Sequence, residues 1–225
     1  MTFGSVYEIT NPLSTVAKQH FVEWFTGKEL PTTRRWALTD NGGNTTGSTT
    51  HDGVDGGYTL EGTGSGSSQQ SLLAFNDKKP FNASGTDGST IIWVAKLTLP
   101  MPASLDGTND ITASQGAWGM CGTMPSYWLN GIKINVPTGA SSYIGFYTMN
   151  HSTEAGTNTD LPVIVAADYK TYKLEQNNTS ANCYIDGVIK ATRTSGMSIY
   201  SMQPFLNQKY PDSDVHAVYC EAWNH

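Results

Sequence analysis

The sequence predicts an all-β protein built as an antiparallel β-sandwich of the jelly-roll type, and three observations lead to this prediction. Short segments of β-branched and aromatic residues recur along the chain. Turns rich in Gly, Asn, Asp and Pro separate about ten such segments, with no helical pattern alternating between them. One turn is Asp186-Gly187, and Asp-Gly between apolar segments is the strongest short-range signal of a hairpin. Two packed antiparallel sheets satisfy all three observations.

The N-terminal segment allows two interpretations. Asn11-Pro12 before LSTVAKQHFVEWFTG predicts a short helix with a capping Asn and a Pro in its first turn, ended by Gly27. The aromatic density of HFVEWF suits a sheet equally well, so a first strand from His20 to Phe25 is the alternative. With the helix preferred, we expect residues 1–28 to pack on a single jelly-roll domain of residues 29–225.

The following segments are predicted to be strands joined by loops. The stretch from Asn41 to Ser68 is dense in Gly, Ser and Thr, which indicates long loops around one short strand near Tyr58 and Leu60. Apolar residues on both faces of the stretch from Ser89 to Leu99 indicate a central strand. Further strands are expected at Gln70–Phe75, Ala117–Gly122, Tyr143–Asn150 and Asp214–Trp223. In the last of these, simple alternation places Val215, Ala217, Tyr219 and Trp223 on one face.

The stretch YKTYKLEQNNTSANCYIDGVIKATRT, which begins at Tyr169, predicts three strands joined by an Asn-rich turn and the Asp-Gly turn. Both central positions of a type I′ turn need a positive φ, which Asp and Gly tolerate. A two-residue turn also sets the register of the hairpin. Ile185 then faces Val188, and Tyr184 faces Ile189.

The composition indicates a sizeable core under a neutral surface. Hydrophobic residues make up 38% of the chain, aromatic residues 11% and charged residues only 14%. The net charge is -6 and no basic run occurs, so we expect no nucleic-acid partner. No charged leader precedes an apolar run, and no apolar stretch has the length of a membrane span. We therefore expect that the protein is made in the cytoplasm of a host cell without a signal peptide. We also expect no membrane partner.

The cysteines are expected to be structural. Cys121, Cys183 and Cys220 cannot all pair within one chain, and their spacing is not that of metal ligands. Each lies within an expected strand. We predict buried small hydrophobic side chains instead of a disulfide or a reactive thiol.

Four segments together resemble the concanavalin A-like (laminin G-like) jelly roll. They are HFVEWFTGKELPTTRRWALTDNGG, GGYTLEGTG, STIIWVAKLTLP and the meander that begins at Tyr169. The resemblance spans most of the chain and implies a fold but not a function. Members of this group include lectins, glycan hydrolases, polysaccharide lyases and virion surface proteins of bacteriophages. The composition rich in Ser, Thr, Gly and Asn is most similar to the phage proteins.

No catalytic pattern is found in the sequence. A glycoside hydrolase needs two carboxylates across the scissile bond, and jelly-roll glucanases carry them as an E-x-D-x-x-E or E-x-D-x-E run. The glutamates of this chain lie apart from any second acid at strand spacing, and lyase motifs are missing. His216 alternates with Val215 and Ala217, which favours a solvent-facing or hydrogen-bonded histidine over a general base. We therefore expect no enzyme.

Two kinds of binding site remain as candidates. The loop Asp106-Gly-Thr-Asn109-Asp110 offers three oxygen side chains for Ca²⁺, and the loop from His51 to Asp55 offers two acids. Asp and Asn are also the usual turn residues, so a plain turn is the favoured interpretation and no cofactor is expected. For a glycan, a flat aromatic face is needed beside polar groups, and Trp118, Tyr127 and Trp128 are the candidates. Core packing is the more frequent use of such residues.

Three functions follow, in order of preference. The first is a non-enzymatic virion surface protein of a phage, a capsid decoration or a tail or fibre component. Its partners would be other virion proteins and further copies of itself, with a host surface glycan as an additional ligand. Few lysines in the expected edge strands agree with edges that a neighbouring protein covers. The alternatives are a carbohydrate-binding, lectin-like module and a divergent glycan hydrolase or lyase.

Overall fold

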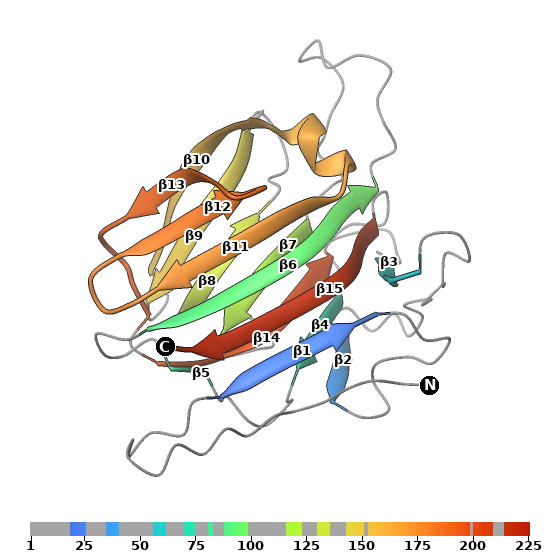
Figure 1. The fold of residues 1–225 in the computed structure, drawn as a ribbon, viewed down its shortest axis with the longest axis horizontal. Coiled ribbons are helices and arrows are strands. Elements are labelled where there is room, and N and C mark those ends of the chain that lie inside the picture. Colours follow the sequence, from blue (N-terminus) through green and yellow to red (C-terminus); the bar gives the residue numbers. More distant parts are fainter. Residues whose placement is uncertain are drawn as a thin grey trace.

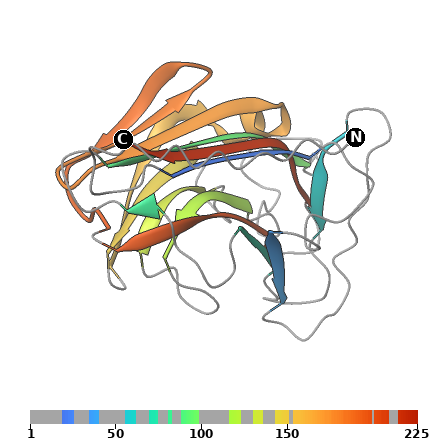
Figure 2. The same ribbon diagram turned by 60° about the horizontal axis from the view of Figure 1, so that its bottom comes forward.

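The structure is a computed structural model that describes residues 19–25, 35–40, 56–61, 70–74, 81–82, 88–98, 116–122, 130–135, 143–150, 153–198, 200–208 and 214–225. These residues form two antiparallel β-sheets that stack face to face (Figures 1 and 2). The helical element among them is one short turn, η3 (Val163–Ala167), and no helix of the described ranges is long and apolar enough to cross a membrane. The predicted all-β antiparallel sandwich is therefore confirmed.

The seven-stranded sheet has the order β1-β15-β6-β11-β12-β13, and β3 pairs with β15 beside β1. Its strands are β1 (His20–Trp24), β3 (Tyr58–Glu61), β6 (Ser89–Thr98), β11 (Lys170–Gln176), β12 (Ala181–Ile185), β13 (Val188–Arg193) and β15 (Asp214–Asn224). In Figure 1 this sheet lies in front, with its outer face toward the reader.

The eight-stranded sheet has the order β10-β9-β8-β7-β14-β4-β2, and β5 pairs with β14. Its strands are β2 (Trp36–Asp40), β4 (Gln70–Ala74), β5 (Phe81–Asn82), β7 (Gly116–Cys121), β8 (Asn130–Asn135), β9 (Tyr143–Asn150), β10 (Thr153–Pro162) and β14 (Ser201–Gln208).

The hydrophobic core lies between the sheets and is centred on β6, which pairs with β15 on one side and β11 on the other. The predicted central strand is thus confirmed, with Ile91, Trp93, Ala95 and Leu97 fully buried and the alternate side chains half-buried. Burying one large apolar side chain contributes roughly 1.5–3 kcal/mol, so this alternation is strongly stabilising.

The predicted hairpin is also confirmed. Asp186 has a φ of 51° and Gly187 a φ of 79°, as a type I′ turn requires. Tyr184 pairs with Ile189, and Ile185 pairs with Val188. The turn is held on β11, because the backbone N–H of Asp186 donates to the carbonyl of Thr171 at 2.9 Å.

The prediction of an N-terminal helix is wrong for the part of that segment that the structure describes. Residues 20–24 form β1, the strand that was the alternative, and the earlier part of the expected helix lies outside the described residues. β1 pairs in register with β15 from His20–Trp223 to Trp24–Tyr219. This pairing gives β1 hydrogen-bond partners along one side of its backbone and buries Phe21, whereas an isolated helix of this length is marginal in water.

The predicted face of the last strand is wrong in its second half. Val215 and Ala217 are buried, but Cys220 and Ala222 continue the buried face in place of Tyr219 and Trp223. The register between β15 and β6 shifts between Ala217 and Tyr219, which marks a β-bulge with one extra residue. Because side chains alternate with a period of two, one extra residue moves every following side chain to the opposite face.

Candidate functional site: an aromatic cluster on the outer face

Five side chains from β1 and β15 gather on the outer face of the seven-stranded sheet. We call them the outer-face cluster: His20, Trp24, Tyr219, Glu221 and Trp223. Strand alternation directs His20 and Trp24 away from the core, because Phe21 and Phe25 between and beyond them are buried. The register places His20 opposite Trp223, and Trp24 opposite Tyr219. The bulge supplies the β15 half of the cluster, since without it these three side chains would face the interior.

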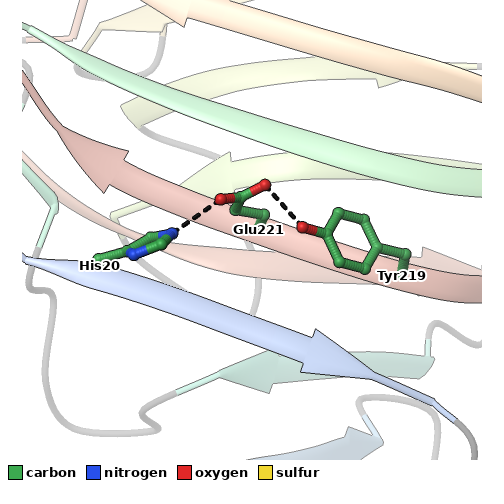
Figure 3. A network of polar contacts seen from close by, with 3 residues as sticks. All are labelled: His20, Tyr219 and Glu221. Atoms are coloured by element: carbon green, nitrogen blue, oxygen red, sulfur yellow. Dashed lines mark hydrogen bonds and ion pairs between the residues drawn. The ribbon is translucent and has the colours of Figure 1, made fainter. Parts of the chain in front are cut away.

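The carboxylate of Glu221 lies at the centre of the cluster (Figure 3). The hydroxyl of Tyr219 donates to its Oε2 at 2.6 Å, and Nε2 of His20 lies 2.7 Å from its Oε1. Burial and then the hydrogen bond to the negative Glu221 raise the pKa of Tyr219, so its hydroxyl stays protonated and remains a donor. Each carboxylate oxygen keeps a lone pair for another donor, and the side chain is about one-quarter exposed (24%).

An exposed aromatic surface adjoins this polar centre. The ring of Trp24 is 56% exposed and lies against the ring of Tyr219, with centroids 4.4 Å apart and planes inclined by 53°. At the other end, the rings of His20 and Trp223 make an edge contact, with their centroids 6.3 Å apart. A large exposed indole beside a partly exposed carboxylate and an imidazole can hold a ligand that is apolar on one face and carries hydroxyl groups on its rim.

His216 is bound within the protein, which confirms one of the two roles expected for it. Its side chain is buried, with Nδ1 at 2.8 Å from the hydroxyl of Thr59 and Nε2 at 2.8 Å from the carbonyl of Gly56. Both ring nitrogens thus have partners, and Tyr169 packs on the ring edge. This histidine holds β3 on β15 and offers nothing to a ligand.

The aromatic residues expected to bind a glycan are not brought together in the described part of the chain. Trp118 is fully buried, with its ring 4.9 Å from that of Tyr172 in an edge contact, and it has no exposed face for a sugar. Tyr127 and Trp128 lie outside the described residues. For Trp118, the alternative interpretation of core packing is therefore the correct one.

The expected calcium loops also lie outside the described residues. These are the loop with Asp106, Asn109 and Asp110, and the loop from His51 to Asp55. Within the described ranges, no group of three or more His, Cys, Asp or Glu side chains is placed to hold a metal ion. The calcium hypothesis stays a prediction.

The prediction for the cysteines is confirmed. None of Cys121, Cys183 and Cys220 forms a disulfide, and all three are buried. Burial raises the pKa of Cys183 to about 12, and raises that of Cys220 well above its ordinary value. Both are therefore protonated and unreactive at neutral pH.

Sequence reasoning missed the outer-face cluster for two separate reasons. On β1, reading HFVEW as a strand would have placed His20 and Trp24 together, so a usable signal existed. On β15, Tyr219, Glu221 and Trp223 do alternate, but their face depends on the bulge. No Gly or Pro marks that bulge in the sequence.

Comparison with known proteins establishes the fold. No protein-family model matches the chain, and no curated protein matches it in sequence. Among solved structures, the carbohydrate recognition domain of Emp47p is similar with a TM-score of 0.60 at 10% identity, over 91% of this chain and 94% of that one. A native glycosidic hydrolase is similar with a TM-score of 0.56 at 14% identity, over 94% and 98% of the two chains.

A third similar structure belongs to botulinum neurotoxin type C, whose cell entry depends on two ganglioside molecules. Its TM-score is 0.53 at 9% identity, over 91% of this chain but 47% of that one. At such identities the likeness concerns the fold alone. The chain has the concanavalin A-like sandwich, which carbohydrate-binding domains and glycoside hydrolases share.

Proposed function

We propose that this protein is a carbohydrate-binding module and that the outer-face cluster is its contact surface. The observation that carries the proposal is the exposed ring of Trp24 beside the partly exposed carboxylate of Glu221. A pyranose stacks its apolar face on an indole, while its rim hydroxyls donate to carboxylate oxygens. The similar carbohydrate recognition domains support the proposal at the level of the fold.

We assign the site to binding and not to catalysis. Hydrolysis of a glycosidic bond needs two carboxyl groups roughly 5–9.5 Å apart. On this face, Glu175 lies two strands from Glu221 and two residues further along the sheet, which places the two Cα atoms roughly 12 Å apart. Asp214 also faces outward, but it precedes Glu221 by seven residues on β15. Glu175 is also ion-paired with Lys173. Both carboxylates are thus held by neighbours in a way that suits hydroxyl recognition.

The expected role on a phage virion is not part of this proposal. The similar structures described above have no connection with bacteriophage virions. One edge strand, β13, carries Lys190, which pairs with Asp160 of β10 at 2.9 Å and so helps to cover that edge within the chain. The virion-surface role stays a prediction.

The proposal is tested by binding measurements on the purified chain and two variants. A glycan array, run with calcium and with a chelator, first identifies a ligand, and calorimetry then measures its affinity. Trp24→Ala should weaken binding at least tenfold, about 1.4 kcal/mol, because it removes the exposed ring.

The matched control is Tyr143→Ala. Tyr143 lies on β9 of the other sheet and is 43% exposed, so it is also an exposed aromatic residue at the surface. Its removal should leave the affinity unchanged. No glycan bound under either condition, or equal affinities of the wild type and Trp24→Ala, would refute the proposed function.

A further inference from the structure

A second, smaller cluster that also combines a tyrosine, a glutamate and a basic side chain lies on the same face of the seven-stranded sheet, on β11 and β12. We call it the distal cluster: Lys173, Glu175 and Tyr184. Lys173 is ion-paired with the carboxylate of Glu175, and that carboxylate is close enough to Tyr184 to help burial raise the pKa of its hydroxyl. The ammonium group of Lys173 also lies 4.9 Å from the centre of the Tyr184 ring.

The distal cluster repeats the chemistry of the outer-face cluster. In each, a partly exposed glutamate lies near a tyrosine and is paired with a basic side chain. The basic side chain is His20 in one and Lys173 in the other. Each cluster therefore offers an aromatic ring, a hydroxyl acceptor and a donor at one point of the surface.

One strand with small outward side chains separates the two clusters. On β6, Ile92 pairs with Glu221 on one side and with Lys173 on the other, and Val94 pairs with Tyr219. Both apolar side chains are half-buried. The registers therefore place the two clusters and this apolar floor in one strip across β15, β6, β11 and β12, which lie side by side in Figure 1. Three strand spacings separate β15 from β12, which is roughly 14 Å.

We infer that the distal cluster is a second subsite of the same platform, which takes a neutral glycan chain lying across the strands. This inference rests on the proposed function. A single sugar unit covers one cluster, whereas a chain of several units reaches both, so affinity should increase with chain length until both clusters are filled.

The charge of the strip selects against acidic glycans. Glu175 and Glu221 are its two acids, and the chain carries a net charge of -6. A chain of uronates would bring like charges against both carboxylates, which disfavours binding. A neutral chain meets no such repulsion, and its hydroxyl groups can donate to both carboxylates and accept from Lys173.

The test measures affinity against chain length for four proteins. Cello-oligosaccharides and laminari-oligosaccharides from the disaccharide to the hexasaccharide are titrated by calorimetry, with oligogalacturonides as the acidic comparison. For the wild type we expect the hexasaccharide of the preferred series to bind at least tenfold more tightly than the disaccharide, and the oligogalacturonides to bind more weakly.

The variants separate the two clusters. Tyr184→Ala should bring the affinity for the hexasaccharide down to that for the disaccharide while leaving the disaccharide itself unchanged. Tyr184→Phe keeps the ring and should retain part of the gain with length. Trp24→Ala should weaken binding of every length, and thermal melting confirms that each variant is folded.

The outcomes distinguish this inference from the proposed function. Three results would overturn the distal subsite and leave glycan binding at Trp24 standing. They are an affinity that does not depend on chain length, an affinity of Tyr184→Ala for the hexasaccharide equal to that of the wild type, and tighter binding of oligogalacturonides than of neutral chains. Failure of every oligosaccharide and every array glycan to bind would overturn both.

Discussion

Glu23 is an acid that faces the interior of the sandwich. It lies opposite the buried Cys220 in the pairing of β1 with β15, on the same face as Phe21. The indole N–H of Trp36 donates to its Oε2 at 3.3 Å. Burial raises the pKa of Glu23, and the Trp36 hydrogen bond and the nearby charge of Arg35 offset only part of that effect. The ionised form is therefore disfavoured by folding.

This shift predicts how stability depends on pH. Because the folded pKa of Glu23 is raised above its unfolded value, its stabilising contribution is present at low pH and lost as the pH rises through the folded pKa. Glu23→Gln keeps an acceptor for Trp36 and removes the titration. We expect the variant to gain stability relative to the wild type as the pH rises from about 4 to 8.

Urea unfolding at each pH measures this difference. Groups that titrate alike in both proteins cancel when the two free energies of unfolding are subtracted, so only Glu23 contributes to the change with pH. A difference that is constant across the pH range, or that falls as the pH rises, would contradict the assigned cause.

At the scale of the element, the hairpin of β12 and β13 is the best example of local sequence specifying local structure. Its turn residues adopt positive φ, and Oδ1 of Asp186 accepts a hydrogen bond from the backbone N–H of Thr171 at 3.0 Å. Lys170 is ion-paired with the same carboxylate at 3.1 Å. The turn thus holds the hairpin against β11, which carries two residues of the distal cluster.

Gly187→Ala should destabilise the protein by about 1 kcal/mol, measured by urea unfolding. The cause is backbone strain alone, because a Cβ at this position meets no atom within 4 Å while φ is 79°. Gly187→Asn is the control, since Asn tolerates positive φ better than Ala, and it should cost less. Equal losses in the two variants would show that strain at this φ is not the cause.

Several elements were not predicted because their sequences lack a strong pattern. β10 is an edge strand of mostly polar residues, so it has no apolar alternation to detect. β14 contains Pro204, which argues against a central strand. The structure accommodates it, because Pro204 lies between the part of β14 paired with β5, which ends at Met202, and the part paired with β4, which begins at Phe205.

At the scale of the whole molecule, the two sheets are joined at one edge as well as through the core. β13 ends the seven-stranded sheet and β10 ends the eight-stranded one. Lys190 and Asp160 form an ion pair between them, and a guanidinium nitrogen of Arg193 donates to the carbonyl of Gly156 at 2.8 Å. Such exposed contacts contribute little energy, so the apolar interior supplies most of the stability.

Cys183 and Cys220 lie in that interior, and Cys121 is buried with Ala117 and Phe205 in a second, smaller apolar cluster. Their burial leads to a prediction for the intact protein. Ellman's reagent should find no reactive thiol under native conditions and three after denaturation, because all three thiols are buried and out of reach of the reagent. A reducing agent should not change Tm, since none of the three cysteines forms a disulfide. Rapid reaction of one thiol in the native protein, or a fall in Tm on reduction, would contradict this prediction.

The sequence by itself determined the class of fold, the central strand β6, and the turn and register of the hairpin. These features depend on residues close to one another in the chain, where alternation and turn chemistry operate. Only the tertiary structure decided that residues 20–24 form a strand and that Tyr219, Glu221 and Trp223 face outward. The first outcome depends on the pairing of β1 with β15, from opposite ends of the chain, and the second on the bulge in the pairing of β15 with β6. Both are pairings between distant segments, and no local pattern carries that information.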